Sequence, residues 1–200
     1  MIKKGEWILL IFNLIYIIAF TIYYIKIQDF EFLWYIAIML VLFALVAGTL
    51  RKTKFSYAVL WGLSIWGLLH MIGGGVSVGG KVLYALELIP IWVTENFYVL
   101  KYDQFVHGYL YFVMTFVVYH LLKKNLNGKF NNWIIYPVVV LASVGISTLN
   151  EIAEFAAVLA LPQTGVGGYF NTAWDLVFNT LGAILAVIVL HLKIRKQGFK

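Results

Sequence analysis

The 200-residue sequence contains no cysteine, and only 12% of its residues are charged, against about 25% in soluble domains. The absence of cysteine excludes disulfides, thiolate metal sites and cysteine nucleophiles. Because 62% of the residues are hydrophobic and the mean hydropathy is +0.89, too few polar side chains remain to build a water-facing surface. The composition therefore excludes a soluble enzyme, a nucleic-acid-binding protein and a disordered chain, and it predicts an integral membrane protein.

Six apolar stretches are long enough to cross a hydrocarbon core of about 30 Å, which requires ~20 helical residues. They are expected at residues 7–25, 32–50, 55–72, 104–122, 133–159 and 174–192. Lys3 and Lys4 precede the first stretch as in a signal peptide, but the stretch is too long and no A-x-A-like cleavage site follows it. We therefore predict an all-α, polytopic, six-helix bundle that forms one integral membrane domain over residues 1–200.

Basic residues predict the orientation of the bundle. Most of them lie at the two termini, between spans two and three, or between spans four and five: Lys3, Lys4, Arg51, Lys52, Lys54, Lys123, Lys124, Lys129, Lys193, Arg195, Lys196 and Lys200. The other three, Lys26, Lys81 and Lys101, lie on the opposite side. Because loops rich in Lys and Arg stay in the cytoplasm, both termini are predicted to be cytoplasmic.

The longest predicted outer connection covers residues 73–103. It starts with Gly73, Gly74 and Gly75, and alternating apolar positions around Gly79 and Gly80 indicate a small β-hairpin. The remaining residues, 84–102, are apolar and rich in aromatics, so we expect them to lie in the outer membrane interface. The outer connection at residues 162–171 has no charged residue, which favours its folding back onto the protein.

Ionisable side chains inside a bilayer cost roughly 2.5 to 3.5 kcal/mol each on insertion scales, so each one needs an explanation. Counted at 1.5 Å per residue from the cytoplasmic edge, four of them lie at about 24 to 27 Å: His70, His107, Glu151 and Asp175. Asp103 and Glu154 lie one turn further out. Spans three to six therefore deliver two histidines and four carboxylates to one layer near the outer boundary of the hydrocarbon.

The spacing of these residues directs their side chains toward one another. Asp103 and His107 are four residues apart, and Glu151 and Glu154 are three apart, so each pair shares a helix face. Four carboxylates gathered in low dielectric require cations or bound protons, and no Lys or Arg is expected in this layer of the spans. Imidazole together with carboxylate is a ligand set for zinc, iron or manganese, so we predict a divalent metal ion as cofactor.

In this hypothesis the metal ligands are His70, His107, Glu151 and Asp175. Asp103 and Glu154 are the candidate catalytic residues, one of them serving as general base to a metal-bound water or supporting a ligand. Asn150 and Asn179 are candidate partners of these groups.

Structural explanations stay open for some of these residues. Residues Thr172 to Asp175 fit a capping box that opens span six, and Asp103 could complement the dipole of span four. A membrane histidine could simply bridge two helices. Glu151 and Glu154 are harder to explain structurally, because neither terminates a helix and both occupy one face of span five.

Three motifs resemble a known family: YDQFVHG at 102–108, NEIAE at 150–154 and NTAWDLVFNTLGA at 171–183. Together with HMIGG at 70–74 they are similar to the YjdF-like bacterial membrane proteins of unknown function, over spans three to six. Their order is also similar to that of VanZ-like proteins, which are associated with teicoplanin resistance and commonly have Gln at the position of Glu154. The resemblance implies a multi-pass protein of the cytoplasmic membrane of a bacterium or archaeon.

These features favour a metal-dependent membrane enzyme that acts on a lipid or lipid-linked substrate of the cell envelope, with membrane lipids as its partners. Two alternatives stay open: an ion- or proton-coupled transporter that uses Glu151 and Glu154 as a relay, and a noncatalytic VanZ-like accessory protein of the cell envelope. No arginine is expected near the cluster, which disfavours a phosphatase that clamps phosphate with Arg.

Overall fold

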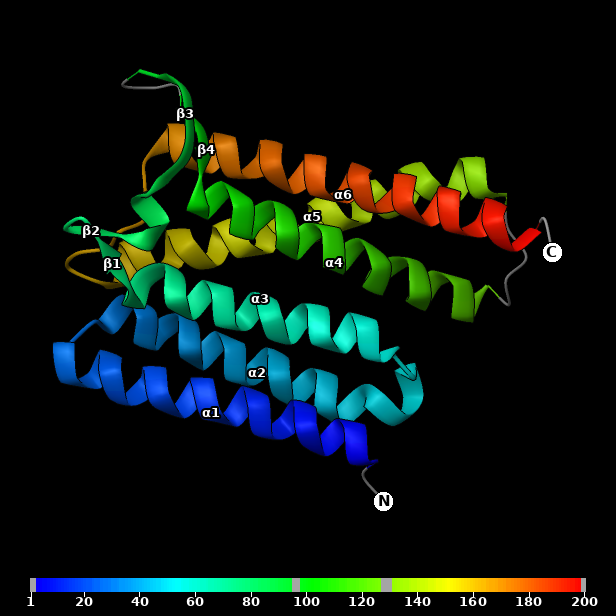
Figure 1. Cartoon of the computed structure of the whole chain (residues 1–200), viewed down its shortest axis with the longest axis horizontal. Coiled ribbons are helices and arrows are strands. Elements are labelled where there is room, and N and C mark those ends of the chain that lie inside the picture. Colours follow the sequence, from blue (N-terminus) through cyan, green and yellow to red (C-terminus); the bar gives the residue numbers. More distant parts are fainter. Residues whose placement is uncertain (1–2, 95–97, 127–130, 199–200) are drawn as a thin grey trace.

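The computed structural model describes residues 3–94, 98–126 and 131–198, which form a bundle of long helices with small β-hairpins at one end (Figure 1). The helices are α1 (Lys4–Ile27), α2 (Phe30–Thr53), α3 (Tyr57–Gly75), α4 (Tyr102–Asn125), α5 (Asn132–Ala160) and α6 (Tyr169–Gly198). All six are long and apolar enough to cross a membrane, so the predicted all-α polytopic fold is confirmed.

The start of α1 and the end of α6 lie at the same end of the bundle, as six crossings require (Figure 1). The strands lie at the opposite end, which we call the outer end. Of the basic residues used to predict the orientation, Lys129 and Lys200 lie outside the described residues. The cytoplasmic side of the termini stays a prediction.

Local capping chemistry sets the short turns between the first three helices. The Asp29 side chain accepts a hydrogen bond of 3.0 Å from the backbone N–H of Phe32 at the start of α2, and Ser56 caps α3 in the same way. Gln28 and Lys54 end α1 and α2 in the left-handed conformation, with φ of 58° and 56°. Each turn therefore reverses the chain in only a few residues.

The helices pack as two groups joined through α4. One apolar core lies among α1, α2 and α3, and a second lies near the terminal end among α4, α5 and α6: Val118, Tyr119, Ile135, Tyr136, Val139 and Leu190. The helix α4 is the most buried of the six, and it packs against α3, α5 and α6. Large apolar side chains cover the outside of the bundle, as expected for a surface in lipid.

Glycine allows α4 and α6 to approach closely. A Cβ atom at Gly182 of α6 would lie 2.1 Å from the backbone oxygen of Gly108 in α4. Small residues at helix interfaces are the usual way to bring membrane helices into backbone contact. This contact fixes the spacing of the two helices immediately beside the polar cluster described below.

Polar side chains inside the bundle join helices that are distant in sequence. Asn13 of α1 donates a hydrogen bond of 2.8 Å to the hydroxyl of Ser64 in α3. The hydroxyl groups of Thr115 in α4 and Ser143 in α5 form another hydrogen bond, of 2.9 Å. Inside a membrane such bonds between helices contribute about 0.6 kcal/mol on average.

The connection between α3 and α4 contains the predicted small hairpin. Strands β1 (Ser77–Val78) and β2 (Lys81–Val82) pair antiparallel around Gly79 and Gly80, whose φ angles are +60° and +83°. The prediction that Gly73 already lies in this loop was wrong, because α3 continues to Gly75. The glycines instead leave room for aromatic rings, since a Cβ at Gly73 would lie 2.5 Å from the ring of Tyr84.

Beyond this hairpin, the short 3-10 helix η1 (Leu83–Ala85) leads into strands β3 (Glu87–Val93) and β4 (Tyr98–Lys101), which pair antiparallel. This second hairpin occupies the stretch expected in the outer interface. The connection between α5 and α6 folds back onto the protein as expected, because the N–H of Gly165 donates to the Glu31 carboxylate of α2.

The helix α6 begins five residues before the predicted start of span six, at Tyr169 rather than at residue 174. The capping-box interpretation of Asp175 was therefore wrong. Asp175 lies inside the helix, and its side chain is fully buried. Its burial needs an explanation other than capping.

Candidate functional site

The outer thirds of α4, α5 and α6 bring the predicted acids and one histidine together. Asp103 and His107 lie in the first two turns of α4, Glu151 and Glu154 lie near the end of α5, and Asp175 lies in the second turn of α6. We call these five residues the acidic cluster. Their convergence was predicted from depth and spacing alone.

His107 is the centre of this cluster. Its Nε2 atom lies 3.6 Å from Oδ1 of Asp103 and 3.7 Å from Oε1 of Glu154. Its Nδ1 atom lies 3.8 Å from Oε1 of Glu151 and 3.2 Å from Oδ1 of Asn179. The ring is buried, so each nitrogen faces a defined pair of oxygen atoms.

The contact with Asn179 sets the proton position on the ring. An amide oxygen only accepts hydrogen bonds, so Nδ1 of His107 carries the proton and donates to Asn179. In the neutral ring, Nε2 then has a free lone pair, which faces Asp103 and Glu154. The Nε2 side is therefore the side that could bind a metal ion.

Asparagine side chains hold three of the four acids. The Asn171 amide nitrogen donates to Oδ2 of Asp103 at 3.2 Å and to Oδ2 of Asp175 at 2.7 Å, which joins α4 to α6. The Asn150 amide nitrogen donates to Oε1 of Glu154 at 2.8 Å. Asn150 and Asn179 were predicted as partners of the cluster, whereas Asn171 was missed.

Two of the acids have buried oxygen atoms without a hydrogen-bond partner among the described residues. These are both oxygens of Glu151 and Oδ1 of Asp175. Leaving a buried charged group unsatisfied is costly, so such atoms in a folded protein indicate a missing partner. A cation, a bound proton or a further hydrogen-bond donor would satisfy these carboxylate oxygens.

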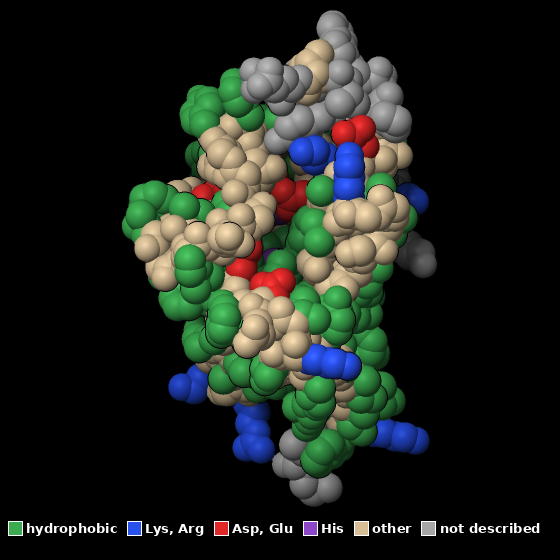
Figure 2. Space-filling view, turned by 90° about the vertical axis from the view of Figure 1, so that its left-hand side faces the viewer, with side chains coloured by type: hydrophobic (Ala, Val, Ile, Leu, Met, Phe, Trp, Pro, Cys, Tyr) green, Lys and Arg blue, Asp and Glu red, His purple; other side chains and the backbone are tan. Residues whose placement is uncertain are grey.

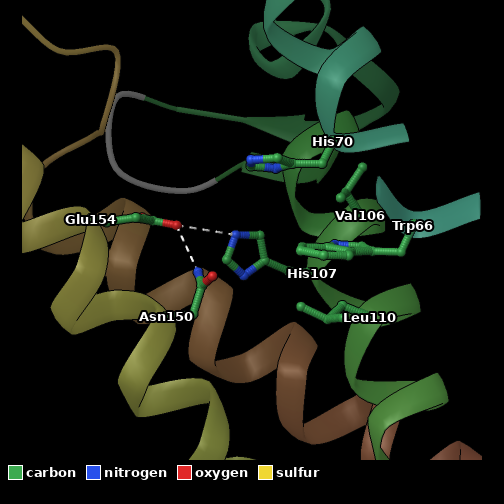
Figure 3. A pocket seen from close by; sticks show the side chains of 7 residues that line it. All are labelled: Trp66, His70, Val106, His107, Leu110, Asn150 and Glu154. Carbon is green, nitrogen blue, oxygen red and sulfur yellow. Dashed lines mark hydrogen bonds and ion pairs between the residues drawn. The ribbon is translucent and has the colours of Figure 1, made fainter. Parts of the chain in front are cut away.

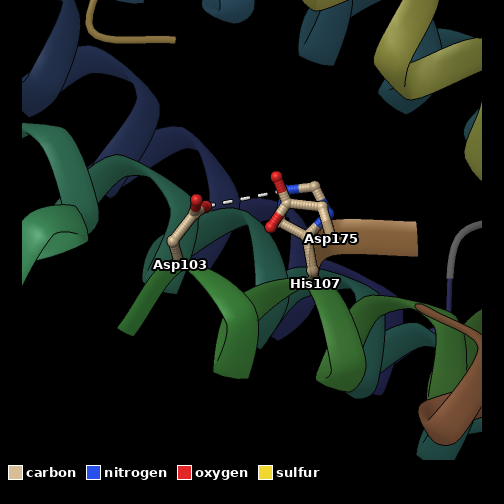
Figure 4. A group of neighbouring side chains, drawn as sticks. All are labelled: Asp103, His107 and Asp175. Atoms are coloured by element: carbon tan, nitrogen blue, oxygen red, sulfur yellow. Dashed lines mark ion pairs between the residues drawn. The ribbon is translucent and has the colours of Figure 1, made fainter. Parts of the chain in front are cut away.

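Two sets of three side chains could each hold a metal ion, with ligand atoms within 4.8 Å of one another. One set is Asp103, His107 and Asp175, and the other is His107, Glu151 and Glu154. Figure 4 shows Asp103 directed toward the His107 ring, with the Asp175 carboxylate overlapping the ring in this view. His107 belongs to both sets, so every candidate ligand arrangement depends on this residue.

His70 lies beside the cluster, outside both sets. Its Nδ1 atom is in a hydrogen bond with the Tyr84 hydroxyl of η1, and its ring stacks on Trp66 at a centroid distance of 5.5 Å. Burial raises the pKa of the Tyr84 phenol well above its usual value, so the phenol stays protonated and donates to His70. His70 as a metal ligand stays a prediction, and this contact favours a role in lining the site.

His70 and His107 line the same pocket, together with Trp66, Val106, Leu110, Asn150 and Glu154. We call it the outer pocket; it is a small cavity of about 10 Å³. Glu154 and Asn150 of α5 face His70 and Trp66 of α3 across it (Figure 3). In the end-on view, Asp and Glu side chains surround a hollow with a histidine at its bottom (Figure 2). The cluster is therefore reached from the outer end.

Lys101 is a cation near the cluster that the prediction did not include. It is the N-cap residue of α4, and its charge acts on Asp175. It lies just outside the helical span, which is why counting depth along the spans did not include it. The positive charge of one lysine does not balance four carboxylates, so an excess of negative charge remains in the acidic cluster.

A family model described as "Predicted membrane protein (DUF2238)" matches residues 8–196, which include all six helical crossings. No curated protein and no solved structure matches the chain. The matched region contains every residue of the acidic cluster and of the outer pocket. The chain therefore belongs to the DUF2238 family of membrane proteins.

Proposed function

We propose that this membrane protein binds a divalent transition metal ion in the acidic cluster and uses it in a reaction on a lipid or lipid-linked molecule of the cell envelope. The observation that carries the proposal is the pair of candidate ligand sets that share the buried His107. Zinc, iron and manganese suit this mixture of imidazole and carboxylate. The resemblance to YjdF-like and VanZ-like proteins supports a place in the cytoplasmic membrane of a bacterium or archaeon.

The ring nitrogens of His107 suggest roles for the individual acids. A metal ion on Nε2 would take Asp103 and Glu154 as its nearest carboxylates. Asp175 completes the first set, and Asn171 orients two of the carboxylates. Glu151 faces the opposite nitrogen and forms the second candidate ligand set with His107 and Glu154.

A bound metal ion would supply an electrophile and an activated water at neutral pH. The protein supplies the rest of the site. Asn171 and Asn150 fix the carboxylates, Asn179 fixes the His107 ring, and the outer pocket gives a substrate access to the Nε2 side. These asparagines are the kind of supporting residues whose loss costs about 10 to 100-fold in metal affinity.

The distribution of polar groups favours an enzyme over the two alternatives. A transporter needs a polar route across the membrane, but the terminal half between α4, α5 and α6 is filled by an apolar core that includes Val118, Val139 and Leu190. A noncatalytic cluster that only locks helices together would satisfy its acids internally. Oδ1 of the fully buried Asp175 has no hydrogen-bond partner among the described residues, which does not fit that purpose.

Metal analysis of the purified protein in mild detergent tests the proposal. We expect stoichiometric metal in the wild type and its loss in His107→Ala and Glu154→Gln. Glu151→Gln is expected to retain metal if the ion occupies the first candidate set, and to lose it if the ion occupies the second. His191→Ala is the matched control, because His191 lies near the other end of α6 against Trp133 and Tyr136.

The same preparations distinguish the alternatives. A wild type without metal, together with proton-driven uptake into liposomes that depends on Glu151, would favour the transporter. Variants that only lower the melting temperature, again without metal in the wild type, would favour the accessory role.

A further inference from the structure

Aromatic rings hold the side chain of His70 at the edge of the outer pocket. Its ring stacks on Trp66, meets Tyr35 of α2 edge-on at a centroid distance of 5.5 Å, and lies 5.8 Å from the ring of Phe32. Rings on three sides leave the imidazole little room to rotate. The two ring nitrogens of His70 therefore keep distinct surroundings.

The Tyr84 hydroxyl sets the position of the proton on His70. Among the residues that the structure describes, Nδ1 of His70 is the one hydrogen-bond partner of this hydroxyl, so the phenol proton has the Nδ1 lone pair as its acceptor. A neutral imidazole whose Nδ1 accepts a hydrogen bond carries its own proton on Nε2. Nε2 of His70 is thus a donor, and it has no lone pair for a metal ion.

The backbone around Tyr84 fixes this contact. The N–H of Leu83 donates a hydrogen bond of 2.8 Å to the carbonyl of Val76, which joins η1 to the end of α3. The ring of Tyr84 lies over Gly73, where a Cβ atom would come within 2.5 Å of it. The fold therefore presents the Tyr84 hydroxyl to His70 in a defined position.

The outer pocket has the size of one water molecule. A cavity needs roughly 10 to 15 Å³ and two to four polar partners to hold a water, and the outer pocket has about 10 Å³. Four of its seven lining residues are polar: His70, His107, Asn150 and Glu154. In Figure 3 the ring nitrogens of His70 point toward the side of the pocket on which Glu154 lies.

These polar groups match the hydrogen-bonding capacity of a single water. Nε2 of His70 offers a proton, whereas the free lone pair on Nε2 of His107 and the carboxylate of Glu154 each accept one. Nε2 of His107 lies 3.7 Å from Oε1 of Glu154, which is too far for a direct hydrogen bond and within reach of a shared water. A water oxygen would accept from His70 and donate to the other two groups.

We propose that the outer pocket binds one water molecule between His70, His107 and Glu154, and that Tyr84 makes His70 the hydrogen-bond donor to this water. His70 is then a positioning residue and not a metal ligand. Binding of the water requires no metal ion.

The place of this water also indicates the class of reaction, in a step that rests on the proposed function. The water lies beside His107 and Glu154, which belong to the candidate ligand sets. In a hydrolysis, its oxygen forms a bond to the electrophilic atom of the lipid or lipid-linked substrate while the bond to the leaving group breaks. One water proton passes through a carboxylate of the acidic cluster to the leaving group. Water is then the second substrate.

Nitrogen-15 NMR of the metal-free protein tests the tautomer and the water together. The protein is labelled with nitrogen-15 histidine, reconstituted in lipid bilayers and treated with a chelator. The four histidines are assigned from the signals that disappear when each is substituted. We expect a neutral His70 with a protonated Nε2, an unprotonated Nδ1, and magnetisation transfer from water to the Nε2 proton. Any other protonation state of His70, or no transfer from water, would overturn the inference.

Two tyrosine variants test whether Tyr84 sets the tautomer. Tyr84→Phe removes the donor to Nδ1, so His70 should show a mixture of both tautomers, with transfer from water weakened several-fold. Tyr102→Phe is the matched control, because it removes a phenol hydroxyl of the same end of the bundle that donates to the backbone oxygen of Leu69. The control should keep the His70 signals of the wild type. A single, unchanged tautomer in Tyr84→Phe would contradict the role of Tyr84.

Zinc titration of the same preparations separates this inference from the proposed function. We expect zinc to shift the signals of His107 and to leave Nε2 of His70 protonated, and we expect His70→Ala to keep the metal that His107→Ala loses. Deprotonation of Nε2 of His70 on zinc binding would overturn the inference and leave metal binding intact. A protein that binds no metal would contradict the proposed function, whereas the water in the metal-free protein would stand.

Discussion

Replacing Gly182 with alanine is expected to damage the acidic cluster from a distance, through the spacing of two helices. The new Cβ would lie 2.1 Å from the backbone oxygen of Gly108 and 2.9 Å from its backbone carbon. Ordinary contacts between such atoms need about 3.5 Å, so α4 and α6 must separate by roughly 1 Å or more. Backbone atoms cannot rotate away as a side chain does, and the separation is therefore unavoidable.

The size of the effect follows from the cost of overpacking, which is typically about 1 to 3 kcal/mol. We expect the upper part of this range, reduced by up to about 1 kcal/mol because alanine favours the helix more than glycine does. For a chain of this length, each kcal/mol lowers the melting temperature by about 2 to 4 °C. The displacement also lengthens the 3.2 Å contact between His107 of α4 and Asn179 of α6, so metal affinity should fall.

The assay is thermal unfolding in detergent combined with metal titration. Gly145→Ala is the matched control, because Gly145 lies inside α5 and a Cβ there would meet nothing within 4 Å. The control should keep the wild-type melting temperature or raise it slightly, and should retain metal. If Gly182→Ala behaves like Gly145→Ala in both measurements, the close approach of α4 and α6 does not hold the cluster.

Three further variants test single contacts of the outer end. Asn171→Ala removes the amide that joins two carboxylates, so metal affinity should fall about 10 to 100-fold in calorimetric titration, whereas unchanged affinity would argue against a supporting role. Tyr84→Phe removes the hydrogen bond to His70 and should cost about 1 kcal/mol. Because burial raises the pKa of the Tyr84 phenol, this cost should stay constant between about pH 6 and 9 and shrink only at higher pH, which unfolding at several pH values would measure. Glu31→Ala removes the acceptor for the N–H of Gly165, so amide exchange in the connection between α5 and α6 should become faster; equal exchange would show that the contact does not hold this loop.

Depth and periodicity were sufficient to predict the helices and most of the site. The four-residue spacing of Asp103 and His107 and the three-residue spacing of Glu151 and Glu154 put each pair on one helix face, and the equal depth of the spans brought the faces together. Both arguments depend only on helix geometry, which the bilayer enforces because every backbone polar group needs an internal partner.

The contacts that were missed depend on where helices end and loops turn. Asn171 was assigned to a loop because the start of α6 was placed too late, although its four-residue spacing from Asp175 follows the same rule as the other pairs. Tyr84 reaches His70 from η1, and no periodicity predicts how a loop folds back onto a helix. His70 matched the others in depth, but depth does not specify which way a side chain points around its helix.

The imbalance of charge in the acidic cluster bears most directly on function. Hydrogen bonds from Asn171 and Asn150 orient carboxylates without neutralising them, and the charge of Lys101 acts from the edge of the cluster. Charges about 4 Å apart at an effective dielectric of 20 repel by roughly 4 kcal/mol, so several carboxylates at this spacing resist ionisation together. A purely structural cluster would be more stable with neutral side chains at some of these positions. The acids surround a histidine whose free nitrogen faces two of them. This arrangement is physically reasonable when a cation occupies the space between that nitrogen and the carboxylates.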